Sequence, residues 1–297
     1  MARTGAQSVK VDGLDPIDRW YFEVRRGTGH GAVASTRQFM LQGAHNARDI
    51  GGYATSNGRM VRWGKVFRSD SLSKLTADDD RALADASVKT VVDYRGDGEI
   101  AKDGADKLPA TAELVHIPVL DDNTQALATA LVTALQEGDP SALQSLLGDG
   151  KAAQLGDEGF VKQLQQPQTM AGYGKTMQLI ADNDGALIYH CTSGKDRTGM
   201  MTALLLGILG VPNQTIVDDF VLSNTFNHEH NEQTYAYLRS KGIDVDLIKP
   251  LMEQRPSEIQ PVLDAVEKAY GGWDSFAEHV LNLSPETLAK LRHKLLV

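Results

Sequence analysis

The stretch ALIYHCTSGKDRTGMMTALLLGIL, residues 186–209, decides the fold class of this chain. Its first part, ALIYH (186–190), is a short apolar run that predicts a buried strand. The glycine-containing turn CTSGKDRTG (191–199) follows, and MMTALLLGIL (200–209) predicts an apolar helix. A buried strand that runs through a short turn directly into a helix is typical of an α/β protein.

The turn itself places Cys191 in front of the amino end of a helix. Backbone N–H groups and the positive end of the helix dipole converge there, so the position binds anions and favours thiolate over thiol. The planar guanidinium of Arg197 can hold two oxygens of one phosphate. Gly194 and Gly199 carry no side chain where the backbone must approach an anion or pack closely. We therefore expect a phosphate-binding turn with Cys191 as its nucleophile.

A plainer interpretation is a small buried cysteine at a strand end, with Lys195, Asp196 and Arg197 as solvated charges. That interpretation does not explain why three charged residues crowd a glycine turn at the most apolar strand–helix junction of the chain. The surrounding context therefore favours the catalytic interpretation.

The segments before this stretch predict that the same sheet continues. Thr76 is a candidate cap for a helix that ends at Ala86, and three aspartates suit the positive end of that helix. Short strands that alternate with helices indicate an α/β sheet with a parallel core. Four segments are strand candidates: RQFMLQ (37–42), VRWGKVFRS (61–69), KTVVDYR (89–95) and ELVHIPV (113–119).

Helical patterns dominate two other parts of the chain. Residues 121–182 interrupt the strand–helix rhythm, and ALATALVTALQ (126–136) has an apolar stripe at helical spacing. This insertion is open to two interpretations, a lid over the turn or static helices packed on the core. The chain after residue 228 also reads as helical, and Ser284 followed by Pro285 is a sound start for the last helix.

Together these patterns predict one α/β domain over residues 37–297, preceded by a lead-in segment over residues 1–36. We expect a central mixed or parallel sheet flanked by helices, with a helical insertion at about 121–182 and a helical C-terminal region.

The composition bounds the classes of function. The 297 residues carry a net charge of −9, which argues against a general nucleic-acid binder because that role needs a basic surface. The single cysteine excludes a disulfide within the chain. No signal-type run or membrane span is visible in the sequence, so a cytoplasmic or secreted protein is expected.

The motif HCTSGKDRTG (190–199) resembles the phosphate-binding loop of the protein tyrosine phosphatase superfamily. It is similar to the bacterial branch that acts on phosphotyrosine, phosphoserine or phosphothreonine, and phosphoinositides. The resemblance covers about residues 38–225 and implies a metal-independent phosphomonoester hydrolase without a cofactor, whose substrate is a phosphorylated protein or a phosphoinositide. Further similar segments are NARDIGGY (46–53), GKVFRSDSLSKLT (64–76), DYRGDGE (93–99) and DDFVLSN (218–224).

The resemblance also implies roles for individual residues of the P-loop, defined here as residues 191–197. Cys191 attacks phosphorus to form a phosphocysteine, and Arg197 with the loop amides holds the phosphate oxygens. Asp196 is the leading general acid. Asp121 and Asp122 are alternatives, because HIPVLDD (116–122) stands where many relatives have a Trp-Pro-Asp loop. Substrate-binding candidates are Thr192, Ser193, Gly194, Lys195 and Thr198.

Supporting roles are expected just outside the P-loop. His190 is interpreted as an orienter of the loop, and Asp93 with Arg95 as an ion pair that braces it. Lys195 has two interpretations, a cation for phosphoinositide head groups or an ordinary surface lysine. The other histidines lack metal-ligand spacing, so no metal site is predicted.

Two functions from other classes compete with this one. A rhodanese-like sulfurtransferase also uses a cysteine in an anion-binding loop, but Arg197 before Thr198-Gly199 and the companion segments argue against it. A silent module that binds phosphorylated ligands would not need a nucleophile, an arginine and a candidate acid together.

Overall fold

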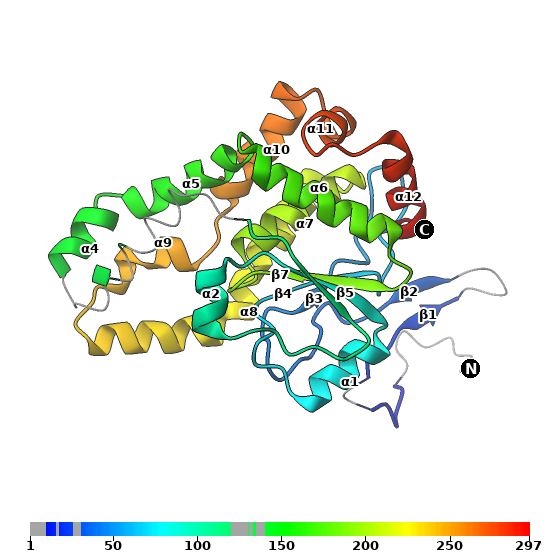
Figure 1. Cartoon of the computed structure of the whole chain (residues 1–297), viewed down its shortest axis with the longest axis horizontal. Helices are drawn as coiled ribbons and strands as arrows, with labels where there is room; N and C mark the ends of the chain where they lie inside the picture. Colours follow the sequence, from blue (N-terminus) through cyan, green and yellow to red (C-terminus); the bar gives the residue numbers. More distant parts are fainter. Residues whose placement is uncertain (1–9, 16–17, 26–30, 120–129, 131–132, 135–139) are drawn as a thin grey trace.

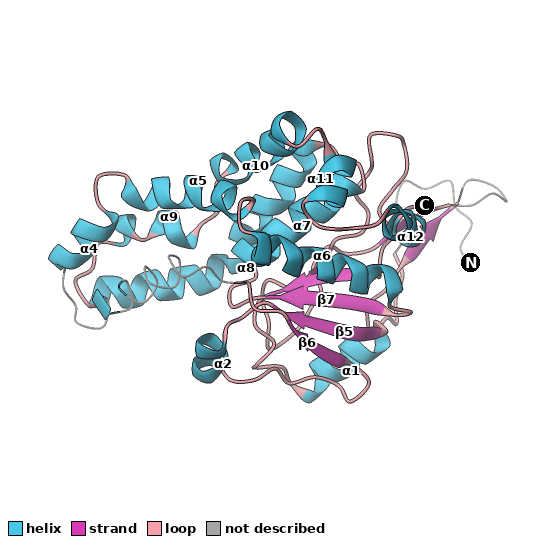
Figure 2. Cartoon of the chain, turned by 45° about the horizontal axis from the view of Figure 1, so that its top comes forward, coloured by secondary structure: helices cyan, strands magenta, loops and turns pink. Residues whose placement is uncertain are grey.

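A five-stranded mixed sheet lies at the centre of the protein in a computed structural model that describes residues 10–15, 18–25, 31–119, 130, 133–134 and 140–297. Helices cover both faces of this sheet (Figure 1; Figure 2), so the predicted α/β fold is confirmed. Four strands run parallel and the edge strand β3 is antiparallel to its neighbour. The order is β3 (Arg48–Asp49), β4 (Val66–Ser69), β7 (Ala186–His190), β5 (Val88–Asp93) and β6 (Glu113–His116).

The central strand β7 separates two hydrophobic cores. Leu187 and Tyr189 enter the larger core, whereas Ala186 and Ile188 enter the smaller one, as the two-residue period of a strand requires. The smaller core is closed by α1 (Ala77–Asp85). The larger core is built with α6 (Pro167–Asp182), α7 (Asp196–Ile208), α8 (Asn213–Ser240), α10 (Pro256–Ala269), α11 (Trp273–His279) and α12 (Pro285–Leu295).

Two helix starts follow their predicted caps. The side chain of Thr76 accepts from the amide of Asp79 at the start of α1, and Asp79 reciprocates in a capping box. The side chain of Ser284 accepts from the amide of Thr287 at the start of α12, with Pro285 at the first helical position. These local signals were sufficient because each cap depends only on residues within one turn of it.

The helical insertion divides between the core and a projecting arm. Helix α6 buries Met170, Tyr173 and Met177 in the larger core, which fits a packed helix. The predicted helix over 126–136 lies largely outside the described residues. The arm has a small core of its own, and it projects on the left of Figure 1. It consists of α4 (Pro140–Leu147), the end of α8, η1 (Val245–Leu247) and α9 (Lys249–Met252), and α5 (Lys151–Gln163) packs against α10 beside it.

The strand prediction for residues 37–42 is wrong. Only Gln38 pairs there, through one bridge to Arg48. The side chain of Arg37 instead stacks on the rings of Tyr53 and Trp63, 3.9 and 4.7 Å from their centroids. Such tertiary contacts override the alternating pattern. In the second candidate, 61–69, the strand begins only at Val66.

The lead-in segment contains a two-stranded antiparallel hairpin, β1 (Phe22–Val24) and β2 (Ala32–Ala34). Just before it, the buried side chain of Arg19 forms an ion pair with Asp49 at 3.1 Å. This contact fixes the segment to the sheet. Within the described residues, no helix is both long and apolar enough to cross a membrane.

Candidate active site

Cys191 lies where the carboxyl ends of three parallel strands meet. It follows the last residue of β7, beside the ends of β4 and β5, and only 2% of its surface is exposed. Helix α7 begins at Asp196, so the P-loop joins the strand directly to the amino end of a helix. In α/β sheets this edge is where ligands bind, and the helix end favours an anion.

Gly194 is required by the path of the loop. Its φ of +65° lies in the left-handed region. A Cβ atom at this position would lie 2.5 Å from the amide nitrogen of Asp70 and 2.6 Å from the carbonyl of Ser69. Any side chain would therefore meet both backbone strain and a backbone clash.

Every carbonyl of residues 191–195 accepts a hydrogen bond from a donor packed against the loop. In a trans peptide the next N–H points the opposite way, so the amides of residues 192–196 are turned away from these donors. Within the described part of the chain, these five amides have no acceptor. Free amides on one side of a loop are suited to binding an anion. The donors are His190 Nδ1 (3.0 Å), Ser71 N (3.0 Å), Asn46 Nδ2 (3.0 Å), Arg68 Nη2 (2.8 Å) and Gln254 Nε2 (2.9 Å), for Cys191 through Lys195 in order.

Arg197 is oriented by a carboxylate that no sequence argument assigned. Glu99, in α2 (Asp97–Asp103), accepts from Arg197 Nη1 at 2.7 Å and Nη2 at 2.6 Å. Nη1 also donates to the carbonyl of Tyr94 at 3.1 Å. A guanidinium has five N–H groups, so the edge formed by Nε and the remaining Nη2 proton is left without an acceptor among the described residues. That edge has the geometry for two oxygens of one phosphate.

The ion pair with Arg197 favours the charged form of Glu99. Burial alone would raise the pKa of Glu99, but the hydrogen bond and charge of Arg197 outweigh burial and lower the pKa to about 2. The hydroxyl of Thr192 donates to the same carboxylate. One side chain thus holds both the second residue and the last residue of the P-loop.

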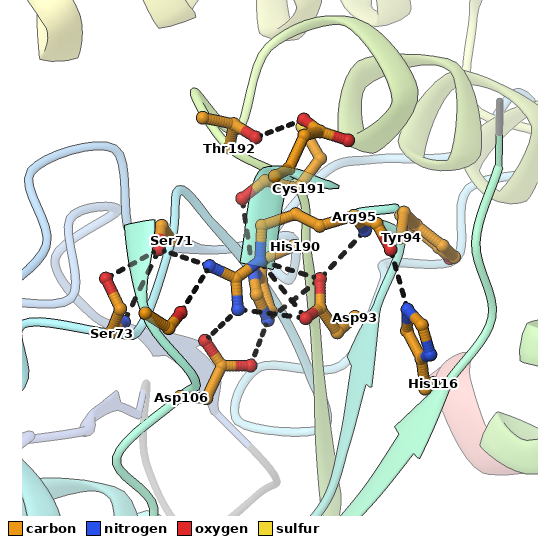
Figure 3. A network of polar contacts seen from close by, with 12 residues as sticks. Ser71, Ser73, Asp93, Tyr94, Arg95, Asp106, His116, His190, Cys191 and Thr192 are labelled. Carbon is orange, nitrogen blue, oxygen red and sulfur yellow. Dashed lines mark hydrogen bonds and ion pairs between the residues drawn. The ribbon is translucent and has the colours of Figure 1, made fainter. Parts of the chain in front are cut away.

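A buried network of polar side chains lies beneath Cys191 (Figure 3). His190 donates through Nδ1 to the carbonyl of Cys191 at 3.0 Å and faces Asp106 through Nε2 at 2.8 Å. Both ring nitrogens face acceptors, which favours the imidazolium. Burial lowers the pKa of His190, but the hydrogen bond and charge of Asp106 outweigh burial and raise the pKa. Arg95 completes the network with ion pairs to Asp93 at 2.9 Å and Asp106 at 2.7 Å.

Among the residues that the structure describes, this network contains the one group of side chains that could hold a metal ion. Ligand atoms of Asp93, Asp106 and His190 lie within 4.8 Å of one another. However, the guanidinium of Arg95 bonds to both carboxylates, and His190 already faces Asp106. A cation would have to displace these bonds, so the donor set is better suited to an ion-pair network than to a metal.

Thr198 presents an unpaired buried hydroxyl at the start of α7. Its Oγ1 is buried and has no hydrogen-bond partner in the described structure. A buried hydroxyl without a partner costs free energy. It is therefore available to bond with a ligand that binds at the start of α7.

Comparison with known proteins agrees with this geometry. The sequence profile of the tyrosine phosphatase family matches residues 39–297. The chain belongs to the tyrosine phosphatase family. The family resemblance inferred from the P-loop is thereby confirmed, and this member of the family is a protein phosphatase.

Relatives of this phosphatase come from several bacteria. A Cupriavidus necator protein predicted to be a tyrosine-protein phosphatase is 29% identical, over 83% of this chain and 84% of the relative. The triple specificity protein phosphatase PtpB of Mycobacterium tuberculosis is 26% identical, over 85% of this chain and 86% of the relative. A tyrosine-protein phosphatase of Nostoc commune is 32% identical, over 52% of this chain and 47% of the relative.

The structure brings most of the predicted site residues together. Cys191, Arg197 and Asp196 lie on one loop, with His190 and the Asp93–Arg95 pair next to it. Asp196 is the first residue of α7, and its side chain is 47% exposed. The alternative acids, Asp121 and Asp122, lie outside the described residues.

Lys195 adopts a different position from the one expected of a surface lysine. Its side chain is 11% exposed, and Nζ donates to the carbonyl of Leu251 at 2.5 Å and to Asp196 at 3.3 Å. The lysine therefore joins the P-loop to the end of α9. In this arrangement the ammonium group of Lys195 bonds to acceptors of the protein itself.

Several residues of the site had no assigned role at the level of sequence. Glu99 had a weak signal, because it closes the segment DYRGDGE (93–99) that resembles the family. Arg68 lay in a similar segment without an assigned chemistry. Asn46 begins the similar segment NARDIGGY (46–53), also without an assigned chemistry. Asp106 and Gln254 carry no motif that points to the P-loop, because each reaches it only through the tertiary fold.

Proposed function

We propose that this phosphatase hydrolyses phosphotyrosine in proteins through a phosphocysteine formed on Cys191. The observation that carries the proposal is the orientation of the P-loop: its carbonyls are all bonded outward, so its amides surround one site beside the buried sulfur. Five amides and the free edge of Arg197 provide enough donors for three phosphate oxygens. This arrangement stabilises the negative charge on the phosphoryl oxygens in the transition state of phosphoryl transfer.

In the first step, the thiolate of Cys191 attacks phosphorus and an S–P bond forms. The bond from phosphorus to the tyrosyl oxygen breaks, and that oxygen takes a proton from Asp196. In the second step, water attacks phosphorus, Asp196 takes a proton from the water, and the S–P bond breaks. The products are tyrosine and inorganic phosphate, and the thiolate is regenerated.

Asp196 is proposed as the acid because it lies within the P-loop at the amino end of α7 with an exposed carboxyl group. Asp196→Asn should slow turnover sharply on esters with poor leaving groups and much less on activated aryl phosphates. Asp121→Asn and Asp122→Asn serve as matched controls. If either control is crippled on poor leaving groups while Asp196→Asn is nearly wild type, the assignment of the acid is wrong.

The proposed substrate range also includes phosphoserine, phosphothreonine and phosphoinositides. The support is the similarity of the P-loop to the broad-specificity bacterial branch, together with the relative named a triple specificity protein phosphatase. The chemistry on each of these monoesters is the same, since only the leaving alcohol differs.

The experiment that tests the function measures phosphate release from a phosphotyrosine peptide, a phosphoserine peptide, an aryl phosphate and phosphoinositides. Wild type and Cys191→Ser are compared in the presence of a metal chelator. Release by wild type alone, with a labelled acid-stable intermediate that is absent in Cys191→Ser, supports the proposal. Equal release by both proteins, or release that requires added metal, refutes the phosphocysteine mechanism.

A further inference from the structure

Two buried arginines share one carboxylate directly behind the P-loop. Arg48 and Arg68 are fully buried, and Asp219 of α8 lies between them. Arg68 Nη1 is 2.9 Å and Arg48 Nε is 3.4 Å from the carboxylate oxygens of Asp219. Tyr53 also donates its hydroxyl to this carboxylate, at 2.8 Å. The cluster comes from three separate elements, β3, β4 and α8.

Both arginines are connected to the loop that holds the nucleophile. Arg68 Nη2 donates to the carbonyl of Gly194 at 2.8 Å. Arg48 Nη1 donates to Asn46 at 2.5 Å, and Asn46 in turn donates to the carbonyl of Ser193 at 3.0 Å. The two guanidiniums therefore support the middle of the P-loop, one directly and one through an amide.

The cluster carries one more positive charge than negative charge. Two guanidiniums face one carboxylate, and an unmatched buried charge costs several kcal/mol. Burial, followed by the like charge of Arg48, lowers the pKa of Arg68 to about 10, and the opposite charge of Asp219 only partly opposes this effect. Arg68 Nε is buried and has no acceptor within the described residues. The cluster thus lacks one anion.

The other charged groups around the P-loop do not supply that anion, because they are matched among themselves. Arg37, which stacks on Tyr53 and Trp63, also acts on Asp219 and adds to the positive excess. The matched groups are Arg197 with Glu99, Arg95 and His190 with Asp93 and Asp106, Arg19 with Asp49, Lys195 with Asp196, and His45 with Asp70.

Cys191 is the group placed to be the missing anion. Arg68 lies opposite Tyr189 of the neighbouring strand β7, two residues before Cys191. Arg68, Arg197, Tyr94 and Tyr173 are among the titratable groups that interact electrostatically with Cys191. Arg197 is already neutralised by Glu99, and the two tyrosines are neutral phenols at ordinary pH. Arg68 is therefore the cation in this set whose counter-ion, Asp219, is shared with a second arginine, so that the pair of arginines has a surplus positive charge.

We propose that Arg68, assisted by Arg48, is a positioning residue whose unmatched positive charge holds Cys191 as a thiolate from behind the P-loop. The inference rests on the proposed role of Cys191 as the nucleophile. It adds a source of stabilisation distinct from the loop amides and the helix end. It also explains why charged rather than apolar side chains fill this part of the core.

The test is the pH dependence of alkylation of Cys191 by iodoacetamide, which follows the thiolate fraction. Cys191 is the only cysteine of the chain, so the signal has one source. Arg68→Met removes the unmatched charge and should move the alkylation midpoint up by about one pH unit, a tenfold effect on the thiol equilibrium. Asp219→Asn increases the positive excess and should move the midpoint down.

Arg68→Met and Asp219→Asn both remove buried hydrogen bonds, so a loosened structure would shift the alkylation midpoint in the same direction in both. Shifts in opposite directions therefore indicate an electrostatic effect. Arg68→Lys keeps the charge and should leave the midpoint close to that of wild type. If Arg68→Met does not fold, the downward shift expected for Asp219→Asn still tests the proposal. Arg81→Met is the control, since it removes an exposed guanidinium that pairs with Asp78 rather than with this cluster, and it should leave the midpoint unchanged. Equal midpoints in wild type, Arg68→Met and Asp219→Asn, or shifts of the same sign in both variants, would overturn the proposal. Alkylation does not require turnover, so this result stands apart from the phosphatase assay.

Discussion

Glu99 Oε1 lies 2.6 Å from Nη2 of Arg197, so a carboxylate on α2 sets the plane of the guanidinium at the end of the P-loop. The same carboxylate accepts from Nη1 and from the hydroxyl of Thr192. The orientation of the arginine is therefore established before any phosphate binds. A phosphate would meet the remaining edge without a change of rotamer.

Glu99→Gln is expected to lower kcat/KM by about 100-fold, because a misplaced guanidinium loses its bidentate geometry. Inhibition by inorganic phosphate should weaken in parallel, since Arg197 binds the same oxygens in substrate and product. Asp97→Asn, which removes an exposed carboxylate from the same helix, is the control and should resemble wild type. Retention of phosphate affinity in Glu99→Gln would contradict this role.

Asp106→Asn is expected to destabilise the fold in a pH-dependent way. Because the folded-state pKa of His190 is raised, the stability from its charged form is fully present below the unfolded value of about 6.5 and is lost as pH rises through the folded value. The variant lacks this contribution. Its deficit in free energy of unfolding should therefore be larger at about pH 6 than at about pH 9. Urea unfolding of both proteins across that range measures the difference, and a deficit that grows with pH would refute the assignment.

Gly194→Ala is expected to lose more stability than Gly210→Ala. Both glycines have positive φ, +65° and +83°, but only Gly194 has neighbours where a Cβ would lie. The alanine at 210 should cost about 1–2 kcal/mol for its backbone conformation alone. The alanine at 194 adds an overpacking cost of about 1–3 kcal/mol and should abolish activity by displacing the loop. Equal stability losses in the two variants, measured by urea unfolding, would show that the clash is relieved by movement.

Lys195→Met is expected to reduce kcat/KM for a phosphotyrosine peptide and for a phosphoinositide by similar factors. The ammonium group is bonded to the carbonyl of Leu251, so its loss disturbs the P-loop whatever the leaving group is. The ratio of the two kcat/KM values is the measurement. A loss much larger for the phosphoinositide would instead assign Lys195 to binding of the head group.

The part of the site that could be predicted from sequence is the part formed by consecutive residues. The strand, the glycine turn and the helix around Cys191 follow from periodicity over a few residues, as do the caps at Thr76 and Ser284. Arg197 and Asp196 belong to the same stretch, so the structure places them beside the cysteine.

The donors that orient the loop could not be predicted in this way. Asp106 is 84 residues from His190 along the chain, and Gln254 is 59 residues from Lys195. Their roles depend on how β7, the segment after α2 and the segment between α9 and α10 pack together. The failed strand at 37–42 has a similar cause, because Arg37 is drawn to two aromatic rings that are distant in sequence.

The solitary buried cysteine also determines how this protein responds to oxidants. A thiolate is the form that peroxides oxidise to a sulfenic acid. No second cysteine exists in the chain to capture that acid as a disulfide. In the proposed mechanism, recovery from a sulfenic acid on Cys191 would depend on an external thiol or on attack by a neighbouring backbone nitrogen. Further oxidation to the sulfinic acid would remove the proposed nucleophile permanently, so the property that suits Cys191 to attack phosphorus would also make it the site of inactivation by peroxide.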